Sequence, residues 1–440
     1  MKKGWQTKKL GDVCDFEGGS QPPKSEFIYD EKPGYVRFLQ IRDFGSDKNI
    51  TYIRHSKKNR LCAEDDILIG RYGASVGKIL TNKAGAYNVA LMKTIPNLEV
   101  LDQSWFYHFL ISDEFQKPLL NVADRSAQAG FSKDDIYNFP VPVPPLAEQQ
   151  RIVGLLDEAF EGLATAKANA EKNLQNARAL FQSVLSQSVI GETTKGWREA
   201  GGAGKTSAVS DLKELFRQIA ATNRKSARGE ETAGHEIITD ALPEEWRHAS
   251  IEQLFNLIDY RGKTASKSDT GHRLITARNI RMGYISEEPV TFISKEQYKK
   301  WMVRGFPKPG DIFFVTEGHT MGFVALNNRT DEFALAQRTI TLQPPVPFST
   351  KFFFYFMLSP HFQKLVKLNA TGAAAVGMKA SKFRSLPLAF PSFAEQEIIA
   401  DKLDELAEET QRLARLYERK HAALEALKKS LLHQAFTGEL

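Results

Sequence analysis

The chain has 440 residues, 42% of them hydrophobic, and a formal net charge of +6. This length predicts two or three domains that can each bury a core. The longest apolar run, near Phe352–Leu358, is far shorter than the roughly 20 residues that cross a bilayer. No apolar segment follows the first lysines, as it would in a secretory signal peptide. We therefore expect a cytoplasmic chain rather than a membrane or secreted protein.

The two cysteines, Cys14 and Cys62, belong to no C-x-x-C pair and no Cys/His cluster. The sequence therefore predicts two reduced thiols and no structural zinc site.

The basic surplus of the chain is confined to particular segments. Residues 246–391 contain 20 Lys and Arg against 10 Asp and Glu, and residues 1–145 contain 20 against 18. Residues 146–190, 191–245 and 392–440 are each slightly acidic. Basic charge gathered in one segment is what a nucleic-acid surface requires, and this interpretation is favoured for 246–391. Ordinary solvated lysines explain 1–145 equally well.

The pattern of residues 1–145 predicts a mixed α/β domain. It contains a strand-like run at Asp66–Gly70, and a helix is expected at Ser104–Ser112. The proline run Pro140–Pro145 ends regular structure, because proline can extend neither a helix nor a central strand.

A proline-free stretch follows, from Leu146 to about Ser188, within a segment bounded at 146–190. Its apolar positions alternate in spacings of three and four, as in a heptad seam. At 1.5 Å per residue this helix would be about 65 Å long, and an apolar stripe of that length needs a partner. The seam positions are Val153, Leu156, Phe160, Leu163, Lys167, Ala170, Leu174, Ala177, Phe181 and Val184.

Residues 191–245 are polar and rich in small residues. One amphipathic segment, Ser210–Ile219, lies within them, and Ser210 or Asp211 would cap it. We expect a connector that carries one short helix.

Residues 246–391 predict a second mixed α/β domain. Strand-like runs stand at Gly310–Val315 and Arg338–Leu342, a helix is expected at Thr350–Ser359, and the prolines of Pro387–Pro391 end the segment.

Residues 392–440 predict a second long helix of matched length. We expect the two helices to pair antiparallel as a coiled coil within one chain, which would place the two domains at opposite ends of a rod. Pairing with a second copy of the chain stays the alternative, because heptads alone do not fix the partner. The second seam is Ile399, Leu403, Leu406, Thr410, Leu413, Tyr417, Lys420, Leu424, Leu427 and Leu431.

The sequence contains an internal repeat of one unit, which is its most informative feature. Four motifs recur at a constant shift of 247 residues, and earlier matches drift as loops of different length require. The constant pairs are Phe115-Gln116-Lys117 with Phe362-Gln363-Lys364, Ala147-Glu148-Gln149 with Ala394-Glu395-Gln396, Leu156-Asp157-Glu158 with Leu403-Asp404-Glu405, and Gly191-Glu192 with Gly438-Glu439. The earlier pairs are Trp5 with Trp246, Leu10 with Ile251, Arg37 with Arg273, Arg42 with Arg278, Asp66 with Asp311, Gly73 with Gly318, and Gly77 with Gly322.

In these motifs the chain resembles the specificity (S, HsdS) subunits of type I restriction-modification systems over nearly its whole length. The resemblance is carried by the duplicated starts of the long helices, Pro145–Ile152 and Phe393–Ile399, and by the duplicated Asp-Ile…Gly-x-x-x-Gly signature, Asp66–Gly77 and Asp311–Gly322. Lys195–Glu199 is similar to the segment after the first helix in some members. Each motif is weak alone, and their duplicated order is specific.

The resemblance implies that 1–145 and 246–391 are target-recognition domains, each reading one half of a bipartite, non-palindromic site on double-stranded DNA. The helices would be spacers that set the gap and dock two methyltransferase (M) subunits, and two motor-nuclease (R) subunits would complete the enzyme. S-adenosylmethionine, ATP and Mg would bind the partners, and this chain would hold no cofactor and no metal. The helix-pair interface would be formed by Leu156, Phe160, Leu163, Leu174, Phe181, Leu403, Leu406, Leu413, Leu424 and Leu431.

Two segments resemble catalytic motifs, but each lacks a required residue. Gly201–Thr206 is similar to a phosphate loop, but Glu199 stands where the first glycine is required and no strand precedes it. Asp311 and Glu317 suggest a nuclease carboxylate pair, but no lysine stands two residues after Glu317, and the first copy has Tyr72 at that position. The sequence therefore predicts a non-catalytic protein.

The remaining chemistry is DNA binding. Arg and Lys read guanine and Asn and Gln read adenine in the major groove, whereas Lys, Arg, Ser and Thr hold phosphates. We select residues on loops that match between the two copies, without separating base contacts from phosphate contacts. The first copy offers Lys24, Arg37, Arg42, Arg71, Tyr72, Ser75, Lys78, Arg125, Ser126 and Gln128, and the second offers Lys263, Arg273, Arg278, Thr316, His319, Thr320, Lys379 and Lys382.

Other classes remain open at this point. They are a self-sufficient enzyme, a coiled-coil scaffold without DNA, and a stand-alone DNA-binding protein outside restriction.

Overall fold

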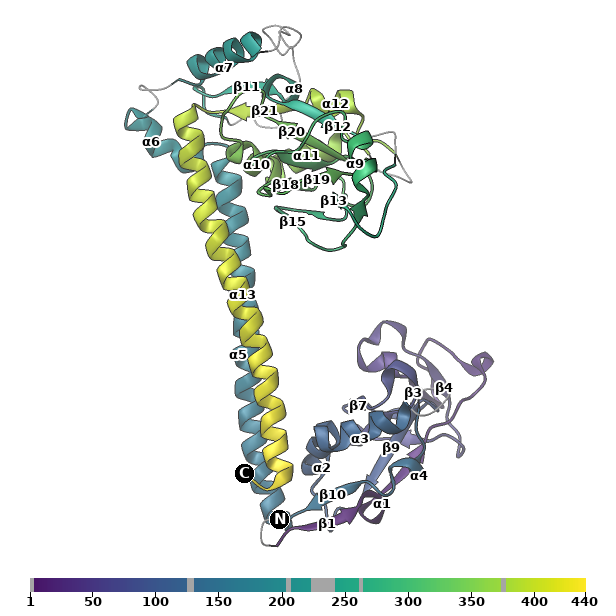
Figure 1. The fold of residues 1–440 in the computed structure, drawn as a ribbon. Coiled ribbons are helices and arrows are strands. Elements are labelled where there is room, and N and C mark those ends of the chain that lie inside the picture. Colours follow the sequence, from purple (N-terminus) through teal and green to yellow (C-terminus); the bar gives the residue numbers. More distant parts are fainter. Residues whose placement is uncertain (1–3, 125–129, 203–206, 223–241, 261–263, 373–376) are drawn as a thin grey trace. The chain divides into compact units, whose positions relative to one another are not determined.

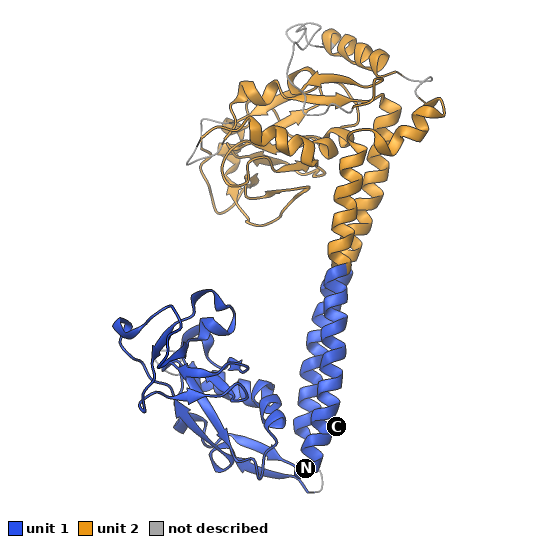
Figure 2. Ribbon diagram, turned by 180° about the vertical axis from the view of Figure 1, so that it is seen from behind, with its two compact units in different colours: residues 1–172, 416–440 blue, residues 173–415 orange. Residues whose placement is uncertain are grey.

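The computed structural model describes residues 4–124, 130–202, 207–222, 242–260, 264–372 and 377–440. The chain forms two compact units, shown in different colours in Figure 2. Unit 1 comprises Met1–Lys172 with Leu416–Leu440, and unit 2 comprises Asn173–Arg415. Each unit contains one α/β domain and parts of two long helices.

The first domain, in unit 1, is built from three small sheets. Two strands close the domain beside the long helices: β1 (Gln6–Lys9) pairs antiparallel with β10 (Pro140–Val143). The second sheet is antiparallel in the order β2 (Cys14–Gly18), β9 (Leu91–Pro96), β6 (Leu68–Gly70), β7 (Ile79–Leu80). The third has the order β4 (Tyr52–Arg54), β3 (Tyr35–Leu39), β8 (Gly85–Tyr87), β5 (Leu61–Cys62), with β3 and β8 parallel.

Short helices cover the antiparallel sheet of the first domain and supply its largest core side chains. Trp105, Phe109 and Phe115 are fully buried. Phe436, from the end of the chain, packs on them, with its ring 4.6 Å from that of Trp105. The helices are α1 (Leu10–Val13), α2 (Gln103–Ile111), α3 (Asp113–Ala123) and α4 (Lys133–Ile136).

The second domain, in unit 2, repeats this arrangement. β11 (Arg247–Ser250) pairs with β21 (Pro387–Phe390). The antiparallel sheet has the order β12 (Asn256–Asp259), β20 (Thr339–Gln343), β17 (Ile312–Val315), β18 (Val324–Leu326). The mixed sheet has the order β16 (Phe292–Ile293), β13 (His272–Ile275), β19 (Phe333–Leu335), with β13 and β19 parallel, and β14 (Ile280–Arg281) pairs with β15 (Tyr284–Ile285).

The helices of unit 2 fall into two groups. Those of the second domain are α8 (Ile251–Leu254), α9 (Lys295–Trp301), α10 (Lys351–Leu358), α11 (Pro360–Leu368) and α12 (Ala380–Arg384). Those that precede the domain are α6 (Lys195–Glu199) and α7 (Ala208–Thr222), which includes the short helix predicted for the connector.

Sheet orders correspond between the two domains strand by strand: β2-β9-β6-β7 matches β12-β20-β17-β18, and the parallel pair β3/β8 matches β13/β19. The predicted fold class, two repeated mixed α/β domains with long helices, is confirmed.

Two helices far exceed all others: α5 (Leu146–Ser188) and α13 (Phe393–Thr437), which Figure 1 shows lying side by side. Within unit 1 they run antiparallel, because Arg151 at the start of α5 donates to the carbonyl of Leu440 beyond the end of α13, and Lys167 lies 3.2 Å from Glu425. Within unit 2, Leu185 at the end of α5 shares a core with Leu403 near the start of α13.

Solvent shielding along the two helices supports most of the predicted seam. None of the ten residues predicted for the helix-pair interface is exposed. In the second seam, however, Lys420 and Leu427 are exposed, so their assignment was wrong. Lys428 takes the shielded place instead, with its ammonium 4.9 Å from the ring centroid of Phe160. The apolar stem of a lysine can cover a ring while its charge stays in water, which a search for apolar residues cannot detect.

Candidate nucleic-acid interface

The two domains share a loop built by the duplicated glycines. Gly73 and Gly77 have φ of +59° and +79°, a left-handed conformation that favours glycine. The Gln116 side chain, from the repeated Phe-Gln-Lys motif, donates to the carbonyl of Gly77 at 2.9 Å. A Cβ atom at Gly77 would stand only 2.6 Å from that side chain. Two motifs far apart in sequence therefore form one structural element.

The same element is present in the second domain. Gly318 and Gly322 have φ of +88° and +89°, and the Gln363 side chain donates to the carbonyl of Gly322 at 2.8 Å. In each domain the turn projects from the end of the antiparallel sheet, because it follows β6 or β17 directly. We call residues 71–77 and 316–322 the edge loops.

A second duplicated contact fixes each domain on a long helix. His108 Nε2 on α2 lies 2.9 Å from Asp157 Oδ1 on α5, and Tyr355 on α10 donates to Asp404 on α13 at 2.6 Å. Burial lowers the pKa of His108, although Asp157 opposes this shift. Since the four residues occupy equivalent places in the repeat, the Leu-Asp-Glu motif serves as the anchor between helix and domain.

The first edge loop gathers three of the predicted DNA-binding residues. The Arg71 guanidinium lies 5.0 Å from the ring centroid of Tyr72, and its Nε donates to the carbonyl of Phe131. Ser75 donates to the carbonyl of Tyr72 at 2.6 Å. Tyr72 is exposed and forms a backbone bridge with Gly130, which brings the segment before α4 against the loop.

The second edge loop gathers the equivalent residues of unit 2. Glu317 forms a backbone bridge with Gly377, and the amide of Met378 donates to the carbonyl of Thr316. This contact brings exposed Lys379 next to the loop, with Lys382 following on α12. His319 is exposed and Thr320 is half-buried on the loop itself.

The other predicted residues lie on different elements. Lys24 is exposed on a short 3₁₀ helix between β2 and β3, Arg42 is exposed on a second one after β3, and Lys78 is exposed just beyond the first edge loop. Arg278 is exposed between β13 and β14. Arg125, Ser126, Gln128 and Lys263 lie outside the described residues.

Three predicted residues are committed inside their own domains. Arg37 pairs with Asp47, and its equivalent Arg273 pairs with Glu287. Both guanidinium groups are largely shielded from solvent, with 24% and 13% of the side chain exposed. Thr316 is fully buried, and its hydroxyl donates to the carbonyl of Arg338. We therefore leave these three out of the proposed DNA surface.

One exposed residue, Arg338, was missed by sequence reasoning, and Glu317 was considered only as part of a nuclease carboxylate pair. Arg338, directly before β20, lies 3.5 Å from Glu317, and 59% and 47% of their side chains are exposed. The first copy has no arginine at the position that matches Arg338. Only the pairing register of the strands brings it to the edge loop, and no motif in the sequence marks it.

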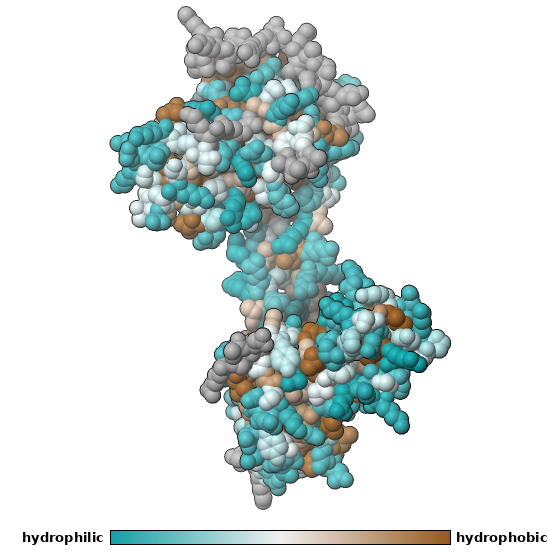
Figure 3. Space-filling model, turned by 90° about the vertical axis from the view of Figure 1, so that its right-hand side faces the viewer, coloured by the Kyte–Doolittle hydropathy of each residue, from teal (hydrophilic) through white to brown (hydrophobic). Residues whose placement is uncertain are grey.

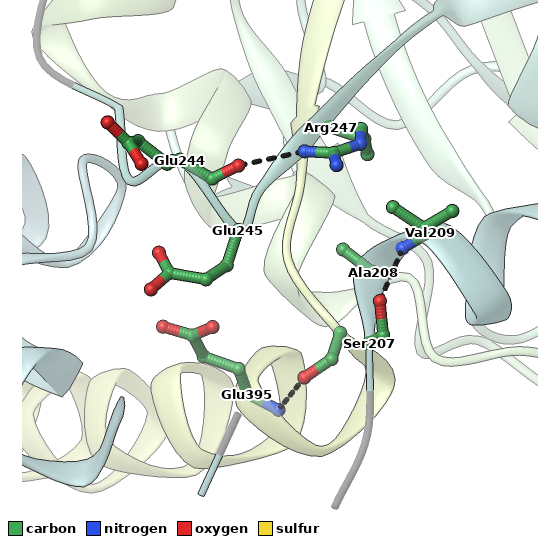
Figure 4. A pocket seen from close by; sticks show the side chains of 8 residues that line it. Ser207, Ala208, Val209, Glu244, Glu245, Arg247 and Glu395 are labelled. Carbon is green, nitrogen blue, oxygen red and sulfur yellow. Dashed lines mark hydrogen bonds between the residues drawn. The ribbon is translucent and has the colours of Figure 1, made fainter. Parts of the chain in front are cut away.

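Figure 4 shows a pocket of about 370 Å³ in unit 2, between the start of α7 and the start of α13. Glu245 and Glu395 turn their carboxylates into it, and Glu244 and Arg247 also line it. Arg198 pairs with Glu395, so three glutamates stand against two arginines. The remaining negative charge opposes the phosphates of a nucleotide. Within the described ranges, no group of three His, Cys, Asp or Glu side chains is placed to hold a metal ion.

Across the described part of the chain, no helix is both long enough and apolar enough to span a membrane. The face of the molecule seen in Figure 3 is mainly hydrophilic, with scattered hydrophobic side chains.

A duplicated α/β domain, anchored on long helices and carrying two equivalent loops with different side chains, defines a modular protein with one such loop in each unit. The sequence model of one family, described as "Type I restriction modification DNA specificity domain", matches residues 2–174 and 243–418. The chain belongs to this family. It is a specificity subunit, which is a non-catalytic component of type I restriction-modification systems.

Relatives and solved structures agree with this assignment. The MjaVIII specificity subunit of Methanocaldococcus jannaschii is 19% identical over 100% of this chain and 94% of its own length. The EcoBI specificity subunit of Escherichia coli is 22% identical over 99% and 86%. A chain from a study of complex assembly in a type I system has a TM-score of 0.71 at 16% identity, covering 100% of this chain and 99% of its own. The HsdS subunit of Thermoanaerobacter tengcongensis has a TM-score of 0.54 at 16% identity, covering 100% and 98%. The two structural likenesses show the fold.

Proposed function

We propose that this chain selects the DNA target of a type I restriction-modification enzyme. Residues 1–145 read one half of a bipartite, non-palindromic double-stranded site, and residues 246–391 read the other half. The observation that carries this proposal is the duplicated edge loop. Its backbone is similar in both domains, with matched left-handed glycines, but it presents Arg71 and Tyr72 in one and Glu317 in the other. A shared frame with different side chains suits two different half-sites.

The long helices, within 146–190 and 392–440, set the gap between the half-sites and dock two M subunits, and residues 191–245 connect the first helix to the second domain. Two R subunits complete the enzyme in the cytoplasm. S-adenosylmethionine, ATP and Mg bind those partners. Adding one heptad near Ala170 and one near Tyr417 lengthens the helices by about 10 Å. The unread gap then grows by at most about three base pairs, at ~3.4 Å per pair, with unchanged half-sites.

The test is to express the chain with its M subunits and to map methylated adenines across the genome. The proposal predicts two different half-sites separated by a fixed gap. A perfect palindrome, or methylation that does not depend on this chain, contradicts it.

Salt dependence tests the phosphate contacts separately. Lys379→Ala and Lys382→Ala should each lower the slope of log affinity against log salt by about one unit, with all sequences weakened alike. Lys367→Ala removes an exposed charge from α11 of the same domain and serves as the control. A scaffold without a DNA role predicts no salt-dependent binding in any variant.

A further inference from the structure

The antiparallel sheets of the two domains end at the same register. In the first domain the last paired residues are Gly70 of β6 and Leu91 of β9, and in the second they are Val315 of β17 and Thr339 of β20. One step further along each pair of strands, the first domain has Arg71 opposite Ala90. The amide of Arg71 donates to the carbonyl of Ala90 at 2.9 Å, so the pairing continues to this point.

In the second domain this step has Thr316 opposite Arg338, and the amide of Thr316 donates to the carbonyl of Arg338 at 3.0 Å. The two domains have therefore exchanged the strand that carries the arginine. Residues directly opposite in an antiparallel pair project from the same face of the sheet, with Cβ atoms about 4.5–5.5 Å apart. An arginine accordingly stands at the same place on the same face in both domains.

Each arginine is held by the same neighbouring position of the edge loop. Tyr72 lies under the guanidinium of Arg71, with 5.0 Å between guanidinium carbon and ring centroid. Glu317, its equivalent, forms an ion pair with Arg338, with 3.5 Å between Glu317 Oε1 and Arg338 Nε. Tyr72 and Glu317 are themselves fixed by matched backbone bridges to Gly130 and Gly377. The position of the guanidinium is therefore the same in both domains, although different sequence positions supply the arginine.

The Arg338 guanidinium remains available to a ligand. More than half of its side chain is exposed, and an exposed ion pair of this length contributes little and is readily exchanged. A guanidinium that projects from a rigid sheet edge presents two parallel N–H groups. Those groups match the O6 and N7 acceptors of guanine in the major groove. Exposed Lys379 follows Met378, whose amide bonds the edge loop, and exposed Lys382 lies on α12, so both offer the charge that phosphates need.

We propose that Arg338 is the specificity-determining residue of the second domain, that it reads a guanine of the second half-site, and that Arg71 does the same in the first. Glu317 is a positioning residue that holds the guanidinium between binding events. This proposal rests on the function proposed above, and it names the residue and the base class that the function leaves open.

The experiment uses the full chain with its M subunits, and compares methylation maps and competitive DNA binding. Arg338→Ala should remove the guanine requirement at one position of the second half-site, with discrimination falling about 5- to 150-fold. The first half-site should stay unchanged. Arg71→Ala should instead remove a guanine requirement from the first half-site and leave the second unchanged. Lys367→Ala, which removes one exposed charge elsewhere in the second domain, should leave the target unchanged.

A transplanted arginine separates base reading from a structural role. Arg71→Thr combined with Ala90→Arg copies the arrangement of the second domain into the first. It should restore the guanine requirement that Arg71→Ala loses. A purely structural role predicts no such rescue, so failure of the double variant to regain discrimination, in a chain that still assembles, overturns the proposal.

Glu317→Gln keeps the shape of the loop and tests the role of the carboxylate. The same target with weaker discrimination supports positioning. A changed base at the neighbouring position shows that Glu317 itself accepts from the amino group of cytosine or adenine, which overturns its assignment. If Arg338→Ala leaves the target unchanged while the Lys379 and Lys382 variants still weaken binding, the assignment of Arg338 is overturned but DNA binding by this domain stands. Absence of sequence-dependent methylation in the unaltered complex instead defeats the proposed function itself.

Discussion

The hydroxyl of Tyr355 donates a 2.6 Å hydrogen bond to Oδ1 of Asp404, joining α10 of the second domain to α13. Tyr355 is buried, and burial together with Asp404 holds the pKa of its phenol well above the usual range. The phenol therefore keeps the proton that it donates at neutral pH. His108 and Asp157 make the equivalent contact in the first domain.

Tyr355→Phe should destabilise unit 2, because it removes a buried hydrogen bond to a charged acceptor while it preserves the ring. The expected loss is about 1.5–3 kcal/mol, measured by chemical unfolding. Lys351→Ala removes the more exposed partner of the same carboxylate and should cost less than about 1 kcal/mol. Equal effects of the two variants would contradict this account of the anchor.

A buried carboxylate ties the connector to the second long helix. Glu395 is 2% exposed and accepts from Trp246 Nε1 at 2.9 Å, from Thr194 Oγ1 at 2.7 Å, and from Arg198. Glu395→Ala leaves the shielded Arg198 charge without this partner, so a loss of about 3–5 kcal/mol is expected. Glu409→Ala breaks an exposed pair with Arg412 on the same helix and should change stability little. Thermal unfolding distinguishes the two, and a mild Glu395→Ala would speak against the network.

The buried Asp311 should make the second domain sensitive to pH. Burial raises the pKa of its carboxyl to about 6, against hydrogen bonds from the Lys308 amide and the Gln343 side chain. A folded-state pKa above the unfolded value means that the folded state favours the protonated form. Stability from this group is therefore present below about pH 4 and lost as the pH rises through about 6.

Asp311→Asn keeps the acceptor oxygen and cannot ionise. Relative to this variant, the unaltered chain should lose up to about 3 kcal/mol between pH 4 and pH 7. Urea unfolding of both proteins at several pH values measures the difference. If the difference in unfolding free energy between the two proteins stays constant across this pH range, folding does not change the pKa of Asp311.

The corrected seam predicts which helix positions tolerate charge. Ala170 is 5% exposed on α5, whereas Leu427 on α13 is 48% exposed. Ala170→Asp places an unpaired charge in the helix pair and should cost several kcal/mol. Leu427→Asp should be nearly neutral. Circular dichroism on heating, with size-exclusion chromatography of the complex with M subunits, checks both. A cost for Leu427→Asp as large as that for Ala170→Asp would contradict the corrected seam.

The repeat made much of this fold predictable. Gln116 with Gln363 and Asp157 with Asp404 were recognisable as repeated residues. The two members of each pair make the same kind of contact, one in each unit. The helix bounds followed from the prolines and from the apolar spacing. Lys428 was not predictable, because a lysine on a seam looks polar in a sequence.

The binding residues were harder to predict for a different reason. Arg37 and Arg273 match in the repeat and were predicted to bind DNA, but each forms an ion pair within its own domain. Arg338 has no match in the alignment of the two copies, and only strand register shows that it replaces Arg71. Duplication therefore marks the shared frame, whereas Arg338, which we propose to read the second half-site, has no arginine as its counterpart in the repeat.

We propose that each domain reads its own half-site with its edge loop and the arginine beside it, which is Arg71 within the first loop and Arg338 opposite the second. The most direct test copies residues 316–322 in place of residues 71–77, an exchange of equal length between loops with the same left-handed glycines. Methylation mapping of this chain with its M subunits should show a changed first half-site, an unchanged second half-site and an unchanged gap. A target in which both halves change, or in which the first half stays as it was, would contradict the account.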